Sequence, residues 1–162
     1  MSIVQRRCTA VIIISFIFAL MLTVMPHPDW LEQIRPLWVV LVLIYWAMAL
    51  PQRVSVGTGW VLGLLLDVAN DAVLGQHALA LAVIAFLTSH LHQRLRVFPQ
   101  SQQAIVVLVF CVIYNLIILW IKGITGTAPS VWLIVFPSFT SALIWPLAFI
   151  VLRHARRFYH VS

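Results

Sequence analysis

The sequence has few charged residues and almost no acidic ones. Charged side chains make up 9% of the 162 residues, and only four residues are Asp or Glu. An ordinary soluble domain carries about 25% charged residues. Hydrophobic residues reach 63%, and the mean hydropathy is +1.05. A chain this apolar is not a soluble globular domain, so we expect the lipid bilayer to be its solvent.

Cysteine is also scarce. Cys8 and Cys111 are the two cysteines of the chain, and neither belongs to a CxxC or Cys/His pattern, so no zinc site or disulfide framework is indicated. Carboxylates do not cluster, and no serine or cysteine has a base at a recognisable spacing. We therefore expect no catalytic residue, no metal and no cofactor, and we predict that the protein is not an enzyme.

Long hydrophilic segments are missing as well. A membrane-spanning helix needs ~20 apolar residues, so six of them use nearly the whole chain and leave no room for a soluble domain. The first is longer than the ~7–15 residues of a signal-peptide core. We predict an all-α polytopic membrane helix bundle, a single domain over residues 1–162 with six transmembrane segments, at about 8–25, 36–50, 54–66, 75–91, 104–121 and 131–152.

The basic residues predict the orientation of these segments. With both termini in the cytoplasm, the cytoplasmic side holds eight Lys and Arg residues and the other side holds Arg35 and Lys122. This asymmetry follows the positive-inside rule. We assign His90, His92, Arg94 and Arg96 to a basic cytoplasmic loop. The tail with Arg153, Arg156 and Arg157 is expected to attract anionic lipids, and the positive charge needs no nucleic acid to explain it.

Tryptophan positions agree with this topology. Indole rings favour the headgroup layer, and four of the seven tryptophans fall where the topology places the outer interface: Trp30, Trp38, Trp120 and Trp132. Trp46, Trp60 and Trp145 sit deeper, and we interpret them as packing residues.

A stripe of small residues marks the third segment. Ser55, Gly59, Gly63 and Asp67 recur every four residues and share one helix face. Gly59-x3-Gly63 is the spacing that lets two membrane helices approach closely. The stripe could pack against another helix of this chain, which is the commoner use of such a motif, or against a partner protein.

Asp67 ends that stripe and leaves two interpretations open. An ionisable group at membrane depth is a functional-site candidate. Alternatively, Asp67 lies at the outer interface, where it pairs with a cation or caps the next helix through the turn at residues 70–75. Arg35, which follows Asp29 and Glu32 in the sequence, could pair locally, bind a partner or reach Asp67.

The motifs together resemble one family. The combination of several short motifs is similar to MreD, the bacterial rod shape-determining membrane proteins: Arg35-Pro36-x-Trp38, Tyr45-Trp46, Ala49-Leu50-Pro51-x-Arg53-Val54-x-Val56-Gly57-Thr58-Gly59, Gly63-x3-Asp67, Leu74-Gly75, Gln102-Gln103-Ala104 and Trp145-Pro146. The resemblance covers essentially the full length of the chain.

This resemblance implies a function. It implies a multi-pass protein of the bacterial inner membrane that acts as a non-enzymatic scaffold in the cell-elongation machinery. The expected partners are MreC and, through it, MreB, RodZ, the glycosyltransferase RodA and its transpeptidase, in support of lateral peptidoglycan synthesis and rod shape. The family also bears a distant likeness to the substrate-binding subunits of energy-coupling-factor transporters, so a small-molecule or lipid-intermediate binding subunit is the alternative. The residues expected to take part in helix packing or partner binding are Arg35, Pro36, Trp38, Ser55, Gly59, Gly63 and Asp67.

Overall fold

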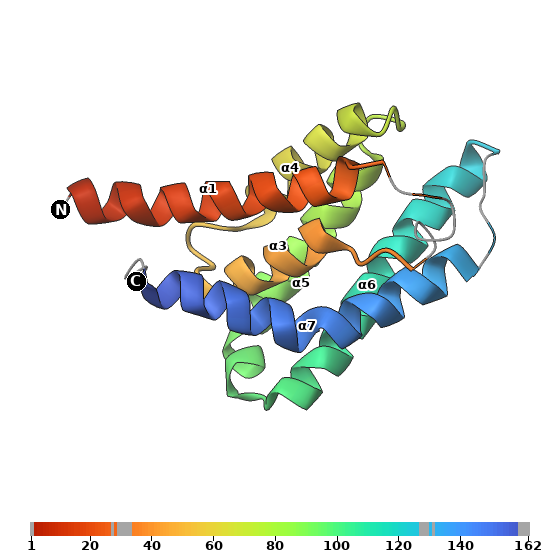
Figure 1. Cartoon of the computed structure of the whole chain (residues 1–162). Coiled ribbons are helices and arrows are strands. Elements are labelled where there is room, and N and C mark those ends of the chain that lie inside the picture. Colours follow the sequence, from red (N-terminus) through yellow and green to blue (C-terminus); the bar gives the residue numbers. More distant parts are fainter. Residues whose placement is uncertain (1, 27, 29–33, 127–129, 131, 159–162) are drawn as a thin grey trace.

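The fold is all-helical. The computed structural model describes residues 2–26, 28, 34–126, 130 and 132–158, apart from the side chains of residues 2–8, 133 and 134. Within these residues the helices follow one another along the chain, as Figure 1 shows: α1 (Ser2–Val24), α3 (Trp38–Ala49), α4 (Val56–Ala69), α5 (Gln76–Val97), α6 (Gln100–Ile124) and α7 (Trp132–Phe158).

Helix α3 forms the centre of the molecule. Its sequence is apolar on every face, which is typical of a helix that is surrounded by others. All its residues from Val39 to Ala49 are buried, and α1, α5 and α7 pack against it. The indole Nε1–H of Trp46 donates a hydrogen bond of 2.8 Å to the Ser15 hydroxyl and so ties α3 to α1. The core therefore lies around a short central helix.

Both termini lie at one end of the bundle (Figure 1), which we call the terminal end; the opposite one is the distal end. Successive helices alternate in direction (Figure 1), so Arg53, Arg94 and the arginines that end α7 belong to the terminal end. Arg35, Lys122, Asp67 and Asp71 belong to the distal end. The charge asymmetry found in the sequence is therefore an asymmetry between the two ends of the fold.

Helix lengths separate two groups. Three helical stretches among the described residues are long and apolar enough to cross a membrane: Gln76–Val97, Gln100–Ile124 and Val135–Phe158. The apolar stretches of α1, α3 and α4 have 16, 12 and 14 residues. At 1.5 Å per residue α3 and α4 measure roughly 18 and 21 Å, less than the ~30 Å hydrocarbon core. Six full crossings and cytoplasmic termini stay predictions.

Several helices extend beyond their predicted limits, and one predicted loop is wrong. His90, His92, Arg94 and Arg96 belong to α5. The helix continues because no breaker occurs before Pro99 and because Arg96 donates hydrogen bonds to two backbone carbonyls at the end of α3, those of Met48 and Ala49. The basic residues predicted to form a loop therefore lie within the last turns of α5.

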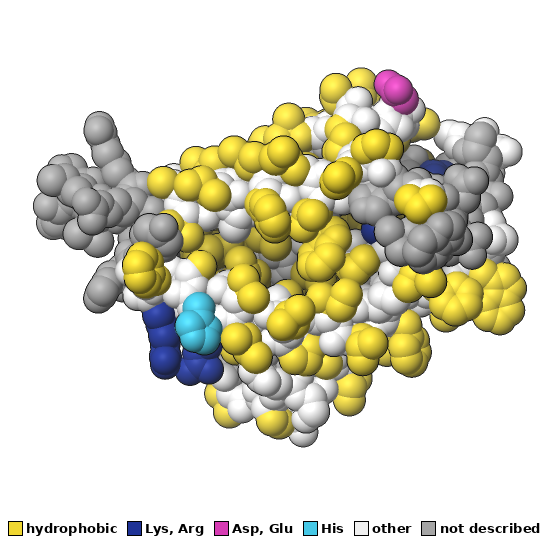
Figure 2. Space-filling view, in the orientation of Figure 1, with side chains coloured by type: hydrophobic (Ala, Val, Ile, Leu, Met, Phe, Trp, Pro, Cys, Tyr) yellow, Lys and Arg dark blue, Asp and Glu magenta, His cyan; other side chains and the backbone are white. Residues whose placement is uncertain are grey.

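Many large hydrophobic side chains are exposed among the described residues. Figure 2 shows hydrophobic side chains spread over the visible face, as expected for a surface in contact with lipid. Trp120 and Trp132 are exposed at the distal end, whereas Trp46 and Trp145 are buried, as predicted. Trp60 was expected to pack inside, and this is wrong, because 52% of its surface is exposed. Gly59 and Gly63 occupy the side of α4 that faces α5. Because successive residues of a helix point in different directions, the Trp60 side chain points away from α5. Trp30 lies outside the described residues.

Candidate functional site

The joint between α4 and α5 holds the most buried charge described in the structure. Asp67, in the last turn of α4, is 1% exposed. Its carboxylate accepts hydrogen bonds from the backbone N–H groups of Gly75 and His77, both at 2.8 Å, and of Ala78 at 3.4 Å. The first N–H groups of a helix have no partner within it, and a negative charge there is stabilised by the helix dipole. Asp67 therefore caps α5.

The His77 side chain completes this cap. Its Nδ1 atom lies 2.8 Å from Oδ1 of Asp67. A carboxylate can only accept, so Nδ1 carries the proton, and the bond fixes the ring orientation. The sequence analysis treated His77 as an isolated residue. Its spacing of ten residues from Asp67 across a turn carries no recognisable signal, so only the fold could reveal the pair.

The glycines of α4 lie against the backbone of α5. A Cβ atom added at Gly63 would lie 2.2 Å from the Cα atom of Ala78, and one added at Gly59 would lie 2.7 Å from the Leu81 carbonyl oxygen. Such distances exclude any side chain at either position unless the helices separate. Of the two interpretations of the stripe, the structure places these glycines in packing within the chain. Ser55 precedes α4 and is exposed, so the close contact begins at Gly59.

The turn between the two helices has a special backbone. Gly75 has a φ of 100°, and Asp71 has a φ of 48°. Both values lie in the left-handed region, which glycine adopts freely and aspartate tolerates. This conformation lets the backbone N–H of Gly75 face the Asp67 carboxylate. Asp71 itself is exposed and is not one of the partners of Asp67.

Arg35 lies at the same end but has another partner. Its Nη2 atom donates a hydrogen bond of 2.9 Å to the carbonyl of Leu22, in the last turn of α1. The hydrogen bonds of Asp67 come from α5, so the possible Arg35–Asp67 pair does not form. Asp29 and Glu32, the possible local partners of Arg35, lie outside the described residues. Arg35 and His77 both line a cavity of about 210 Å³, together with Asn70, Tyr114 and Asn115.

Pro36 and Trp38 introduce α3. The Pro36 carbonyl accepts a hydrogen bond of 3.0 Å from the Trp38 backbone N–H, and the half-buried Trp38 ring lines an apolar groove between α1 and α7. The Leu37 backbone N–H, which is free of helical partners at this point, donates to the Ser141 hydroxyl of α7. The seven predicted residues thus fall at three places: the α4–α5 joint, the entry to α3 and the exposed start of α4.

Polar side chains that the sequence analysis did not select as site residues also join helices. Gln103 donates to the Leu95 carbonyl at 2.9 Å and accepts from the Trp145 indole at 3.4 Å, and so joins the α5–α6 connection to α7. Asn115 of α6 donates to the Ser138 hydroxyl of α7 at 3.0 Å. No sequence spacing links these pairs, since the partners are up to 42 residues apart.

This geometry holds α4 and α5 together. The hydrogen bond between Asp67 and His77 resembles the carboxylate–histidine pair of a catalytic triad. The other acceptor positions of the Asp67 carboxylate, however, are occupied by backbone N–H groups at the start of α5. Among the described residues, no group of three or more His, Cys, Asp and Glu side chains gathers to hold a metal ion. The structure therefore defines a class: an all-helical protein with long apolar helices, the form of an integral membrane protein.

Comparison with known proteins identifies the family. Residues 5–155 match the family model described as rod shape-determining protein MreD. A protein of Haemophilus influenzae, named rod shape-determining protein MreD, is 34% identical over 142 residues, which cover 88% of each chain. The chain belongs to the MreD family of rod shape-determining proteins. No solved structure matches it.

Proposed function

We propose that this protein is a non-enzymatic scaffold of the cell-elongation complex, which binds MreC in the membrane and supports lateral peptidoglycan synthesis and rod shape. The match to the MreD family over residues 5–155 carries this proposal. Through MreC the scaffold communicates with MreB, RodZ, RodA and its transpeptidase.

The use of the polar side chains supports a scaffold. The buried Asp67 and Gln103 and the exposed Arg96 each bind backbone groups of another segment, so these polar side chains fix helix positions. Large hydrophobic side chains remain exposed on the outer surface. Since hydrogen bonds between membrane helices contribute only about 0.6 kcal/mol on average, partner affinity would come mainly from side-chain packing on that surface.

The proposed location is the bacterial inner membrane, with six crossings and both termini in the cytoplasm. The concentration of basic residues at the terminal end supports this orientation. Reporter fusions test it: a fusion at the C-terminus should be active only with a cytoplasmic reporter, and periplasmic activity of that fusion would reverse the topology.

Depletion of the protein in its own bacterium tests the function. We expect the cells to lose rod shape and become round, and tagged protein to co-purify with MreC. Gly59→Leu or Gly63→Leu should reduce co-purification more than Asp67→Asn does, because the glycine changes move α4 away from α5. Gly57→Ala is the matched control, since a Cβ atom there meets nothing within 4 Å. Continued rod growth without the protein, or MreC recovery unaffected by the glycine changes, would refute the proposal.

The second candidate function is that of a subunit that binds a small molecule or a lipid intermediate. The observation that favours it is the cavity of about 210 Å³ at the distal end, which Arg35 and His77 both line. Saturable binding of a ligand to purified protein, abolished by Asp67→Asn through the loss of the His77 contact, would support this candidate. Binding that Asp71→Asn abolishes equally would count against the site.

A further inference from the structure

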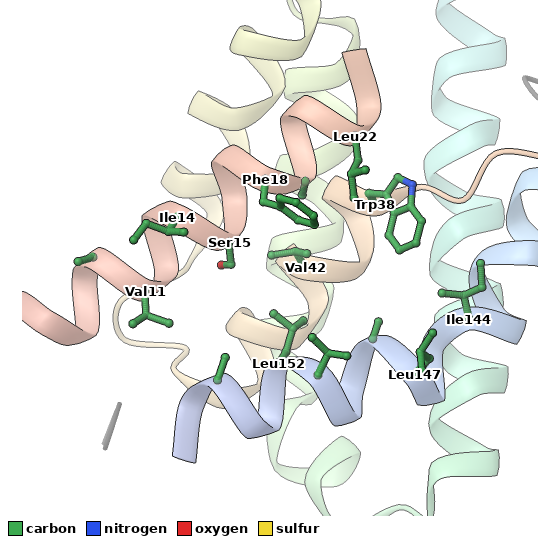
Figure 3. A pocket seen from close by; sticks show the side chains of 15 residues that line it. Val11, Ile14, Ser15, Phe18, Leu22, Trp38, Val42, Ile144, Leu147 and Leu152 are labelled. Carbon is green, nitrogen blue, oxygen red and sulfur yellow. The ribbon is translucent and has the colours of Figure 1, made fainter. Parts of the chain in front are cut away.

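Helix α4 presents an apolar face to its surroundings. Figure 3 shows the side chains of the groove between α1 and α7 converging on one space, whereas α4 contacts α5 through its glycines and turns its large side chains outward. The exposed apolar residues of this face are Val56, Trp60, Val61, Leu65 and Val68. Exposed polar residues bound the face, with Arg53 and Ser55 before α4 and Asp71 after it. Lipid is the expected neighbour of such a face in a membrane protein.

The apolar face of α4 is short. From Val56 to Val68 it measures roughly 18 Å at 1.5 Å per residue, and any tilt of the helix makes its span across the membrane smaller. On α6 the exposed apolar side chains extend from Ile105 to Ile124, roughly 29 Å at the same rise. The α6 face therefore matches the ~30 Å hydrocarbon core of a bilayer, and the α4 face does not.

The neighbouring helix α5 becomes polar at the level where α4 begins. The two helices run in opposite directions (Figure 1), and Gly59 lies against Leu81 and Ala85. Val56, three residues before Gly59, is therefore level with about residues 84–88 of α5. The polar residues that follow directly on α5 are Ser89, His90, His92, Gln93, Arg94 and Arg96. The apolar parts of the two helices thus end at the same level.

Trp60 marks the same boundary independently. Its side chain is exposed, which the packing role expected from the sequence does not explain. Trp60 lies roughly 6 Å from the start of the apolar face at Val56. If α4 were centred in a ~30 Å core, Trp60 would lie roughly 12 Å from the nearest headgroup layer. Because indole rings favour that layer, the exposed Trp60 fits a thin hydrocarbon region better than a thick one.

Helix α4 cannot lengthen its apolar span by moving. Its glycine contacts with α5 and the cap formed by Asp67 hold it at one level. The Arg53 side chain can extend toward the headgroups, but the side chains of Ser55 and Asp71 are short. A hydrophobic stretch shorter than the bilayer is also accommodated when the bilayer becomes thinner around it. The deformation therefore falls on the lipid.

We propose that this protein thins the bilayer beside α4 and α5, while the bilayer beside α6 keeps its ordinary thickness. The surface formed by α4 and α5 thus has the lipid bilayer itself as its partner, with the headgroup layers drawn toward Trp60 on one side and Asp71 on the other. This goes beyond the proposed scaffold role, because it is an effect on the surrounding membrane that needs no second protein. It rests on the proposed topology, in which α4 crosses the membrane.

Depth measurements on spin-labelled full-length protein test the proposal. In a background with Cys8→Ser and Cys111→Ala, a nitroxide is attached to a cysteine at position 61 of α4 or 116 of α6, where Val61 and Leu116 are 52% and 51% exposed. Each protein is reconstituted in phosphatidylcholine vesicles with 18-carbon monounsaturated chains. Electron paramagnetic resonance then gives the depth of the label from its relative accessibility to oxygen and to a water-soluble nickel chelate.

The two labels should report different depths. The label at position 61 should lie roughly 8 Å from the nearest headgroup layer, against roughly 14 Å if α4 were centred in an unthinned core. The label at position 116 should lie at roughly 12 Å and serves as the internal control. In vesicles with 14-carbon chains, the depth at position 116 should decrease and the depth at position 61 should stay the same, because the polar ends of α4 already fix it.

A double variant tests whether the polar residues set the thickness. Arg53→Leu with His90→Leu removes exposed polar groups from the boundary of α4 and α5, and Arg94 lies one turn further along α5. The label at position 61 should then lie deeper by up to about 5 Å, one helical turn. Arg157→Leu removes another exposed charge at the terminal end, on α7, and should leave this depth unchanged.

Three results would overturn the proposal. A depth near 14 Å at position 61 in 18-carbon vesicles would show an unthinned bilayer. A label at this position that is sheltered from both oxygen and the nickel chelate would show that protein covers the face. A depth at position 61 that decreases together with that at position 116 in 14-carbon vesicles would show that the lipid sets it, and not α4.

Failure of the topology is detected separately. Gln52→Cys and Asn70→Cys place thiols at exposed positions on either side of α4. We expect a membrane-impermeant maleimide to reach them from opposite sides of the membrane. Reaction of both from the same side would refute the crossing of α4, and with it the thinning. Loss of MreC recovery, in contrast, bears on the scaffold role alone.

Discussion

The α4–α5 joint and the α1–α7 groove use opposite kinds of packing. At the joint, glycines bring two helix backbones into contact, and a buried carboxylate fixes the start of α5. At the groove, two helices lie on either side of α3 with large apolar side chains between them and an open volume of about 670 Å³. The joint is specified by backbone contact and directed hydrogen bonds, which tolerate almost no change. The groove is specified by the shapes of its apolar side chains alone.

This difference suggests a division of labour. The scaffold role proposed above needs one part that keeps its geometry and another part that can adapt to its surroundings. The joint supplies the fixed part, because backbone contacts and charge-assisted hydrogen bonds are costly to break. The groove supplies the adaptable part, because contacts between aliphatic side chains are individually weak and not directional. Substitutions at the two regions should therefore differ strongly in effect.

The largest effect is expected at Gly63. Gly63→Ala places a Cβ atom 2.2 Å from the Ala78 backbone, so α4 and α5 must separate. Overpacking typically costs 1–3 kcal/mol, and rigid backbone puts this case at the upper end, about 3 kcal/mol. Thermal unfolding in detergent, followed by circular dichroism, measures the loss. Gly57→Ala on the same helix should stay within about 0.5 kcal/mol of the wild type. Equal stability of the two variants would contradict the close packing.

A somewhat smaller effect is expected at Asp67. Asp67→Asn removes the charge and turns one acceptor into an amide donor that faces the N–H groups of α5. We expect a loss of about 2 kcal/mol in unfolding free energy and faster hydrogen exchange of the Gly75 and His77 amides. Asp71→Asn changes the same charge at an exposed position and serves as control. Unchanged exchange in Asp67→Asn would disprove the cap.

The smallest effect is expected where α1 meets α3 beside the groove. Ser15→Ala removes the acceptor of the Trp46 indole hydrogen bond. Bonds of this kind in membrane proteins contribute about 0.6 kcal/mol, so the unfolding free energy should fall by that order. A double-mutant cycle with Trp46→Phe isolates the coupling. A coupling as large as the Asp67 effect would remove the contrast between the two regions.

Sequence patterns predicted the parts of the fold that depend on local composition. The apolar segments located each helix among the described residues, because burial in lipid or in an apolar core requires continuous hydrophobic residues. The glycine spacing at Gly59 and Gly63 predicted close helix contact, because only a missing side chain permits it. The limits of the helices were less well predicted. Arg96 continues α5 past the apolar run, since its partners are carbonyls of a helix 48 residues away in the sequence.

The candidate site was predicted only in part, for a similar reason. Asp67 stood out because acidic residues are so rare in this chain. Its partner His77 did not, because one histidine among six has no distinguishing neighbour in the sequence. Trp60 was assigned to packing from its depth in the segment, and this failed because the direction of a side chain depends on which face of α4 meets α5.

The sequence by itself determined the solvent of this protein, its helical class and its MreD family, because composition and motif order are properties of the chain alone. Tertiary structure decided what the rare polar residues do. Asp67 caps a helix, Arg35 donates a hydrogen bond to a backbone carbonyl, and the space between α1 and α7 forms an apolar groove. A hydrogen bond or a groove needs groups from distant segments to meet, and the scarcity of charge that marks this sequence does not say where they meet.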